Sequence, residues 1–392
     1  MDFNSDARII AACPNRMAPW VEAELLSLGY EPVRTFKTGV EIRGNMMDCI
    51  RLNLSLRCAT QVRYSLGGFR ATGPEDIYKN ACKIRWEEII PANGYFSVNN
   101  SAEHLTLNNT MFINMKVKDA IVDRFREVTG ARPDSGSSND HTVIHLHWKE
   151  DHAELFLDTS GEVISRHGYR RIPGKAPMQE SLAAAVILAT GWDRRQPFVN
   201  PMCGSGTLAI EAALLASGRK PGLLRSNYAF MHLEGYQPAM FEQARVQLEQ
   251  EVSDPEGVVI IASDIRSGAV EDARENARMA GVEHLIRFEC CDFRETPMPE
   301  GPGVVVINPE YGERMGEESE LEATYSAIGD FFKKQCPGYV GAIFTGNLDL
   351  AKKVGLKASR RIEFYSAQLD CRLLTYELYQ GTRRTPTAGQ NP

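Results

Sequence analysis

From residue 178 onward the sequence alternates short apolar runs with longer amphipathic segments, and this alternation constrains the fold more than any other feature. The apolar runs are rich in Val and Ile and almost uninterrupted, as in "VVIIASD" and "VVVINP". Such runs are typical of parallel strands that are covered by helices on both faces. The predicted strands cover residues 198–201, 257–264, 286–292, 303–309 and 339–347, and the predicted helices cover residues 178–191, 204–218, 267–281 and 320–335. We therefore expect an α/β domain built on a parallel sheet.

Two more predicted strands close this part of the chain. Residues 359–370 and 371–380 alternate in the manner of strands and have no helix between them. We expect them to form an antiparallel hairpin at one edge of the sheet. The last residues, 381–392, are polar and rich in Pro and Gly, which predicts a flexible tail.

Residues 1–160 have a different organisation, in which short strands and helices are mixed. The predicted strands cover residues 7–14, 39–44, 61–71, 94–103, 141–151 and 152–161, and the predicted helices cover residues 18–29, 46–59, 74–90 and 108–130. This pattern indicates an α+β assembly of small units. Periodicity is lost in residues 161–177, and we place the boundary between the two parts there.

The composition narrows the class of protein. The 392 residues suffice for two or three domains of roughly 100–200 residues each. No apolar run approaches the ~20 residues of a bilayer span, and the N-terminus has acids before its short apolar stretch, unlike a secretory signal. Nine cysteines are scattered without a CxxC pair, which favours reduced thiols in a cytoplasmic protein over disulfides or zinc. We expect no metal site and no membrane partner.

The charge distribution leaves room for local contacts with nucleic acid. A net charge of −7 argues against a protein that coats nucleic acid with its whole surface. Basic residues nevertheless gather between residues 51 and 86 and in the turn-rich stretch 166–175. The candidate RNA contacts in these two clusters are Arg57, Arg63, Arg70, Lys83, Arg170 and Arg171. A solvated face without a ligand is the alternative for either cluster.

The stretch "FVNPMCGSGTLAIEAA", residues 198–213, is the first that carries chemistry. A short strand runs through a glycine turn directly into a helix. Gly204 and Gly206 would let backbone N–H groups approach a ligand, because no Cβ is in the way. The helix N-terminus behind them favours a carboxylate or another negative group. The spacing matches neither the GxGxxG fingerprint nor a P-loop.

Polar residues also stand at the ends of the next three strands. Asp264 is in position to accept hydrogen bonds from ribose hydroxyls, although a helix cap is an alternative role for it. Asp292 could take the amine of an adenine while Phe293 covers the ring. Asn308 ends the fourth strand. Because open α/β sheets bind ligands at the carboxyl ends of their strands, four such positions in register predict a shared nucleotide-type site.

The motifs "NPMCGSGTLAIEAA", "CDF" and "NPEYGERMG" resemble those of the S-adenosylmethionine-dependent RNA methyltransferases that carry a THUMP domain. Within that family they are similar to the bacterial 23S rRNA guanine-N2 methyltransferases, specifically to the N-terminal methylase half of the fused enzymes. The resemblance spans nearly the whole chain. It implies a Rossmann-like class I methyltransferase domain at residues 178–380. It further implies a ferredoxin-like subdomain at 1–60, a THUMP-like RNA-binding domain at 61–160 and a cofactor-closing linker at 161–177.

The resemblance also implies S-adenosyl-L-methionine as the cofactor. Its methionine part would lie against Asn200, Pro201, Cys203, Gly204, Ser205 and Gly206. Its ribose would be held by Asp264 beside Ile265, and its adenine by Asp292 and Phe293. Met178 and Glu180 belong to a segment that would close over the cofactor.

The stretch Asn308-Pro309-x-Tyr311 is similar to the Asn-Pro-Pro-aromatic signature of enzymes that methylate exocyclic amines. Such an amine is a poor nucleophile, because its lone pair is delocalised into the ring. If the Asn308 side-chain oxygen and the Pro309 carbonyl accept its two hydrogens, the nitrogen becomes more tetrahedral and is aimed at the methyl group. Tyr311 would stack on a base taken out of its helix. A plain strand-ending turn is the structural alternative.

Glu310 stands where that signature has a second proline. Its carboxylate could accept a hydrogen bond from guanine N1–H or N2–H, or it could be an exposed bystander. The leading hypothesis is an RNA guanine-N2 methyltransferase that acts on 23S rRNA. A transfer-RNA guanine-N2 methyltransferase of the same group, and a catalytically silent RNA-binding or assembly factor, are the alternatives.

Overall fold

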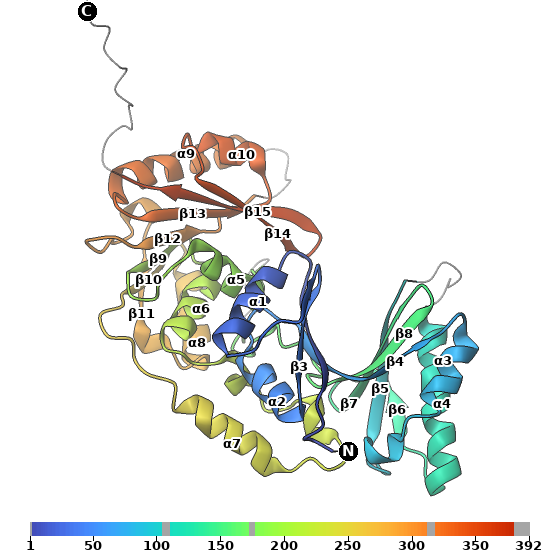
Figure 1. The fold of residues 1–392 in the computed structure, drawn as a ribbon. Helices are drawn as coiled ribbons and strands as arrows, with labels where there is room; N and C mark the ends of the chain where they lie inside the picture. The colour runs from blue at the N-terminus through green and yellow to red at the C-terminus, as the bar shows by residue number, and fades with distance from the viewer. Residues whose placement is uncertain (1, 104–109, 172–176, 312–317, 380–392) are drawn as a thin grey trace, which may run out of the picture. The chain divides into compact units, whose positions relative to one another are not determined.

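The computed structural model describes residues 2–103, 110–171, 177–311 and 318–379 (Figure 1). Its contacts divide the chain into two compact units. The first unit comprises Met1–Arg170, Met178–Ala185 and Ser217–Asp254, and the second comprises Arg171–Pro177, Val186–Ala216 and Pro255–Pro392. Helix α5 (Glu180–Thr190) begins in the first unit and ends in the second. Within the described ranges, no helix is both long and apolar enough to cross a membrane.

The first unit is built on one sheet, which in the described ranges has the strand order β2-β3-β1-β4-β8-β7-β5-β6. The strands are β1 (Ala7–Ala12), β2 (Arg34–Phe36), β3 (Gly39–Gly44), β4 (Gln61–Arg70), β5 (Tyr95–Glu103), β6 (Asp134–Gly136), β7 (Thr142–Lys149) and β8 (His152–Asp158). Strand β4 pairs with β1 on one side and with β8 on the other. The boundary predicted between residues 60 and 61 therefore falls inside a continuous sheet.

The helices of this unit follow the predicted amphipathic segments. They are α1 (Ala18–Ser27), α2 (Met46–Ser55), α3 (Pro74–Ala81) and α4 (Thr110–Thr129), with α2 packed on β4 and α4 on β5. The helix predicted over residues 74–90 ends at Ala81 and is followed by a 3-10 turn, Trp86–Glu88. It ends early because the buried indole of Trp86 donates to the carbonyl of Ala81 (2.7 Å), which folds the chain back on the helix end.

The segment Ser217–Asp254 lies inside the predicted methyltransferase domain in sequence but packs in the first unit. It contains two 3-10 turns, η2 (Pro221–Leu224) and η3 (Ala229–His232), and helix α7 (Pro238–Glu249). Tyr228 and Phe230 are fully buried and stack with ring centroids 5.1 Å apart. Gly222 approaches α2 so closely that a Cβ there would be 2.4 Å from the Cα of Leu54. The compact units thus differ from the predicted domains, because local sequence pattern does not reveal where an insertion packs.

The second unit has a sheet with the strand order β11-β10-β9-β12-β13-β15-β14 among its described residues. The strands are β9 (Phe198–Pro201), β10 (Ile260–Asp264), β11 (Ile286–Cys290), β12 (Val304–Ile307), β13 (Val340–Thr345), β14 (Arg360–Ser366) and β15 (Leu369–Glu377). The strands from β11 to β13 are parallel, whereas β15 is antiparallel to both β13 and β14. The predicted parallel sheet with a terminal antiparallel hairpin is confirmed.

Helices cover both faces of this sheet (Figure 1). They are α6 (Thr207–Ala216), α8 (Ser267–Met279), α9 (Glu318–Gln335) and α10 (Leu348–Lys353). Helices α6 and α8 pack on β9, β10 and β11. On the other face, Tyr325 and Phe332 of α9 join a buried cluster with Val305 and Ile307 of β12. The predicted tail at 381–392, part of the predicted linker (172–176) and Gly312 lie outside the described residues.

Candidate active site

Strands β9 and β12 separate where the strand order of the second sheet reverses. Their last paired residues are Val199 and Val305. Beyond them, the Nδ2 of Asn200 donates to the carbonyl of Val306 (2.9 Å) and bridges the opening. Asn200 is 1% exposed, and its Oδ1 is buried with no hydrogen-bond partner in the described part of the chain. A buried amide oxygen without a partner costs free energy. Within the described residues, Asn200 Oδ1 is therefore an acceptor that a bound ligand could satisfy.

After β9 the chain turns through residues with left-handed backbone. Met202, Gly204 and Gly206 have φ values of 54°, 55° and 82°. The N–H of Gly204 donates to the Asp264 carboxylate (3.0 Å). A Cβ at Gly206 would be 2.8 Å from the Cβ of Ala273, so a glycine is required where the turn meets α8. The turn is thereby fixed against the end of β10 and against α8.

The Cys203 side chain and the Ser205 backbone of this turn have ordinary structural surroundings. Burial, together with the nearby charge of Asp264, raises the pKa of the Cys203 thiol, which is therefore neutral. The carbonyl of Ser205 accepts from Nδ2 of Asn276 (3.2 Å), a residue that is 1% exposed. The Oδ1 of Asn276 accepts the N–H of Arg171 (3.1 Å). Asn276 thus ties the glycine turn to the chain that enters the second unit.

Asp264, at the end of β10, is the residue that connects these features. Besides the Gly204 N–H, its carboxylate accepts the backbone N–H of Arg266 (3.0 Å), whose guanidinium Nε lies 3.4 Å away. A carboxylate has about four acceptor sites, so Asp264 can hold the turn and still accept from a hydroxyl group. Ile265 beside it is 67% exposed and offers an apolar surface next to the carboxylate.

Asp292 and Phe293 are engaged within the protein. Asp292 accepts the backbone N–H of Arg294 (2.9 Å) and both of its guanidinium contacts (2.8 Å), and this pairing lowers the pKa of Asp292. Phe293 packs edge-on against Phe331 with ring centroids 5.9 Å apart. Asp292 therefore caps a short 3-10 turn and Phe293 contributes to the core. Their roles toward an adenine stay predictions.

Asn308 and Pro309 follow β12 directly. The Oδ1 of Asn308 is buried and has no hydrogen-bond partner in the described ranges, while Pro309 is buried and Glu310 is exposed. In the described part of the chain, the neighbouring strands β9 and β12 therefore each have, at or next to their last residues, an amide oxygen without a hydrogen-bond partner. Two such acceptors at one sheet edge suit a ligand that brings N–H donors, such as an ammonium group or an amine.

Tyr311 is half-buried, and its ring is fixed by its neighbours. A Cβ at Gly346 would be 3.1 Å from Cε2 of Tyr311, so the ring lies against the glycine that follows β13. Cys371 of the β14–β15 hairpin lies beside the same glycine, with its Sγ 3.4 Å from that Cβ position. Burial, more than the contact with Cys371, raises the pKa of Tyr311 to about 12. The phenol is therefore neutral and held in one orientation.

Met178 and Glu180 are buried and belong to the first unit. The Nε of Arg170 lies 3.3 Å from Oε1 of Glu180, and its Nη2 donates to the Met178 carbonyl (2.7 Å). Only 12% of the Arg170 side chain is exposed. The Arg170 guanidinium thus holds the residues before α5, and a contact of Arg170 with RNA stays a prediction. A role for Met178 and Glu180 toward the cofactor stays a prediction.

The other predicted RNA contacts divide by exposure. Arg57 is 5% exposed and donates from Nη2 to the carbonyl of Arg219 (2.6 Å), so its guanidinium has a structural role here, and a contact of Arg57 with RNA stays a prediction. Arg63 is largely buried, and this burial lowers its pKa. Arg70, Lys83 and Arg171 are exposed and stay candidates. Charge clusters in sequence do not reveal which guanidinium groups turn inward.

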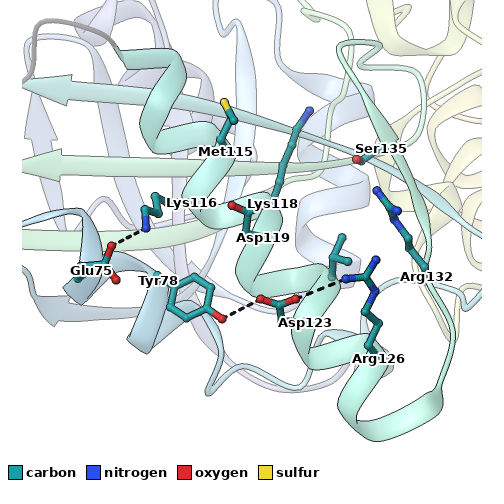
Figure 2. Close-up of a pocket in the computed structure, with 11 residues that line it drawn as sticks. Glu75, Tyr78, Met115, Lys116, Lys118, Asp119, Asp123, Arg126, Arg132 and Ser135 are labelled. Atoms are coloured by element: carbon teal, nitrogen blue, oxygen red, sulfur yellow. Dashed lines mark hydrogen bonds and ion pairs between the residues drawn. The ribbon is translucent and has the colours of Figure 1, made fainter.

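A hollow of about 370 Å³ lies in the first unit between α3, α4 and β6 (Figure 2). Its charged side chains pair with one another: Lys116 with Glu75, and Arg126 with Asp123, which also accepts from the hydroxyl of Tyr78 (2.8 Å). The lining also includes Lys118, Asp119 and Arg132, so basic side chains outnumber acidic ones by one, and this small excess does not single out a ligand. None of the predicted cofactor or catalytic residues lines it.

Sequence reasoning missed the residues that support the site from behind. Asn276 supports the glycine turn, and Gly346 makes room for the Tyr311 ring beside Cys371. Only Gly346 had a local sequence signal, because it is a glycine directly after an aliphatic strand. The other contacts join residues that are distant in sequence, so no local pattern indicates them.

The family comparisons agree with this architecture. Residues 167–375, more than half of the chain, match the family described as RMKL-like, methyltransferase domain. Residues 8–63 match the RlmL ferredoxin-like domain, and residues 71–158 match the THUMP domain.

Curated relatives share sequence over nearly the whole chain. The ribosomal RNA large subunit methyltransferase K/L of Syntrophotalea carbinolica is 35% identical over 388 residues, which are 96% of this chain and 54% of that protein. The protein of the same name from Methylococcus capsulatus is 33% identical, over 97% of this chain and 52% of its own length. The chain spans about half the length of these relatives.

Two solved structures share the fold along almost their full length. SMU.472, a methyltransferase solved in complex with SAH, aligns with a TM-score of 0.86 and 27% identity, over 98% of this chain and 100% of its own. A protein of Listeria monocytogenes, described as a predicted N6-adenine-specific DNA methylase, aligns with a TM-score of 0.87 and 29% identity, over 95% of this chain and 97% of its own.

Proposed function

This chain belongs to the RMKL-like methyltransferase-domain family, and from that premise we propose that it methylates the exocyclic N2 amine of a guanine in large-subunit ribosomal RNA, with S-adenosyl-L-methionine as the methyl donor. The relatives named for ribosomal RNA support the substrate, and the SAH complex of SMU.472 supports the cofactor. The THUMP match supports an RNA partner for the first unit. Such a reaction takes place in the cytoplasm.

The observation that carries the proposal is a pair of buried amide oxygens, one on Asn200 of β9 and one on Asn308 after β12, that have no hydrogen-bond partner among the residues the structure describes. Oδ1 of Asn200 would accept from the ammonium group of the cofactor's methionine part, and Asp264 from its ribose. When bound, the cofactor supplies a methyl group on a positively charged sulfur. The neutral Cys203 thiol and the glycine turn leave this part of the site without a competing nucleophile.

The residues after β12 would prepare the amine. Oδ1 of Asn308 and the carbonyl of Pro309 accept its two hydrogens, so that the nitrogen lone pair points out of the ring plane. Tyr311 stacks on the base and fixes its plane. Holding the amine nitrogen in line with the methyl group makes the largest contribution to catalysis. The amine becomes acidic only as it gains the methyl group, so it can lose its proton to solvent without a strong general base.

Glu310 would select guanine. Its carboxylate is exposed between Pro309 and Tyr311, and guanine carries an N1–H beside the N2 amine, whereas adenine has an unprotonated N1. A carboxylate that accepts from N1–H would leave an unpaired acceptor opposite any base that lacks this donor.

Nucleoside mass spectrometry tests the proposal. Ribosomal RNA from cells that lack this protein should lose one N2-methylguanosine, and the purified chain with S-adenosylmethionine should restore it at the same position. If the modification is lost from transfer RNA instead, the substrate assignment is wrong. If calorimetry detects cofactor binding but no RNA is methylated, the chain is a binding factor and the proposed activity is wrong.

A further inference from the structure

The hairpin of β14 and β15 ends at the same sheet edge as the motifs of the candidate site. Strand β15 runs antiparallel to β13, with Arg372 opposite Thr345, the last residue of β13. Ser366 pairs with Leu369 across a two-residue turn in which Ala367 has a φ of 53°. The hairpin tip therefore projects just beyond the end of β13, and its backbone is fixed by strand pairing on both sides of the turn.

This tip is packed together with Tyr311. The contact is made at Gly346, where the Tyr311 ring and Cys371 of strand β15 both approach the same backbone position. A Cβ built on Gly346 would be 3.1 Å from the Tyr311 ring and 3.4 Å from Sγ of Cys371, so the three residues meet at one point. Whatever stacks on Tyr311 therefore lies next to the hairpin tip.

Two leucines at this point are exposed to solvent. Leu369, two residues before Cys371, is 55% exposed, and Leu348, two residues after Gly346, is 45% exposed. A single exposed leucine is ordinary in a soluble protein. Leu348 and Leu369, however, both lie close in sequence to residues that contact Tyr311, the predicted base-stacking residue. Leu369 also stands directly after the tight turn of the hairpin. Together the two leucines could form an apolar rim around a bound base.

We propose that Leu369 enters the RNA base stack beside the target guanine and occupies the space that the guanine leaves when it moves onto Tyr311. The inference rests on the proposed function. A base must leave its stack before an enzyme can act on it, and apolar side chains inserted between base steps hold such gaps open. A guanine on Tyr311 stays covalently attached to its strand, so the neighbouring nucleotides must pass the hairpin tip. The occupant is thus the RNA strand itself, and Leu348 lines the same rim.

The test compares Leu369→Ala with the wild type on two short RNAs that carry the mapped target guanine. In one RNA the guanine is paired inside a stem, and in the other the same sequence is unpaired. We expect Leu369→Ala to slow methylation of the stem by about tenfold or more and to change methylation of the unpaired RNA by less than about twofold, because only the stem must be opened. Leu26→Ala, at a leucine of α1 that is 56% exposed, is the matched control and should match the wild type on both.

A second readout follows the base directly. With 2-aminopurine in place of the target guanine in the stem, binding of the wild type should raise the fluorescence, and binding of Leu369→Ala should not. Equal losses on both RNAs would show that Leu369 merely supports Tyr311, and an unchanged rate on both would show that it has no role; either result overturns the inference. If the wild type methylates neither RNA, the proposed function itself fails.

Discussion

Asn308 is the residue on which the proposed chemistry depends most directly. Its side-chain oxygen is buried at the end of β12 and has no hydrogen-bond partner in the described ranges. Within the described residues no donor uses this oxygen, so an amine bound there would find an acceptor that is still available. Tyr311 differs, because its ring is already packed against Gly346. In the proposed mechanism, the Asn308 oxygen is available to the substrate amine, and the Tyr311 ring is already in place for the substrate base.

Asn308→Ala should lower the rate of methyl transfer by about a hundredfold or more, as removal of one group that acts on the reacting atom does in other enzymes. Cofactor affinity measured by calorimetry should stay unchanged, since the substitution does not touch the glycine turn. Asn4→Ala, at an exposed asparagine of the first unit, is the control. Full activity of Asn308→Ala would rule out the amine clamp.

Glu310→Pro should remove the preference for guanine over 2-aminopurine, which keeps the N2 amine but lacks the N1–H. We expect the wild type to favour guanine by about tenfold, the value of one hydrogen bond to a charged acceptor. Competition between the two RNAs, followed by mass spectrometry, measures the ratio. The same ratio and the same rate in both proteins would make Glu310 a bystander.

The pH dependence of the reaction should carry no contribution from Tyr311. Burial raises the pKa of Tyr311 to about 12, so the phenol stays protonated, and neutral, at every pH below that value. The methylation rate should therefore show no decline from this group between about pH 7 and about pH 10, where an ordinary tyrosine begins to ionise. A decline near pH 10 that disappears in Tyr311→Phe would contradict the buried, neutral phenol.

At the scale of elements, the glycine turn between β9 and α6 depends on close packing against α8. Left-handed backbone at Gly204 and Gly206 lets the chain reverse, and the Asp264 carboxylate holds the turn at the end of β10. The contact between Gly206 and Ala273 leaves no room for a side chain. The shape of the glycine turn and the packing of α8 therefore depend on each other, and a change to either should affect both.

Gly206→Ala should lower the free energy of unfolding by about 1–3 kcal/mol, because the new Cβ meets Ala273 and the left-handed backbone is strained. It should weaken cofactor binding at the same time. Thermal denaturation and calorimetry check the two effects. Gly268→Ala is the control, since a Cβ at Gly268 in α8 meets nothing within 4 Å. If Gly206→Ala binds the cofactor normally but is less stable, the shape of the glycine turn does not depend on its contact with α8.

At the scale of the whole molecule, the segment Ser217–Asp254 makes the first unit discontinuous in sequence. Its aromatic residues Tyr228 and Phe230 are fully buried, and the Arg57 guanidinium donates to the carbonyl of Arg219. The first unit is therefore complete only after the chain has passed through part of the second. We expect the two parts of the sequence to depend on each other for folding.

Gly222→Ala should destabilise the first unit by about 1–3 kcal/mol, since a Cβ there would meet the backbone of α2 at Leu54. Hydrogen exchange should then show faster exchange both in residues 217–254 and in α2. Gly73→Ala is the matched control, because a Cβ at Gly73 meets open space. Loss of protection confined to residues 217–254 would show that α2 is stable without the insertion.

The sequence by itself determined most of the strands and helices, the class of fold and the positions of the candidate motifs, although it missed α7 and extended α3 beyond Ala81. Apolar periodicity depends on neighbours one or two turns away, and the carboxyl ends of parallel strands must meet at one edge. Asn200, Gly204, Asp264 and Asn308 could therefore be assigned to one edge before any coordinates were known.

Only the tertiary structure decided which groups face inward and which segments belong together. It buried Arg57 and Arg170, placed Cys371 beside Tyr311, and joined residues 217–254 to the first unit. Each of these outcomes depends on a contact between residues that are ten to more than a hundred and fifty positions apart. Local sequence pattern carries no information about such contacts, because they follow from how the whole chain excludes water.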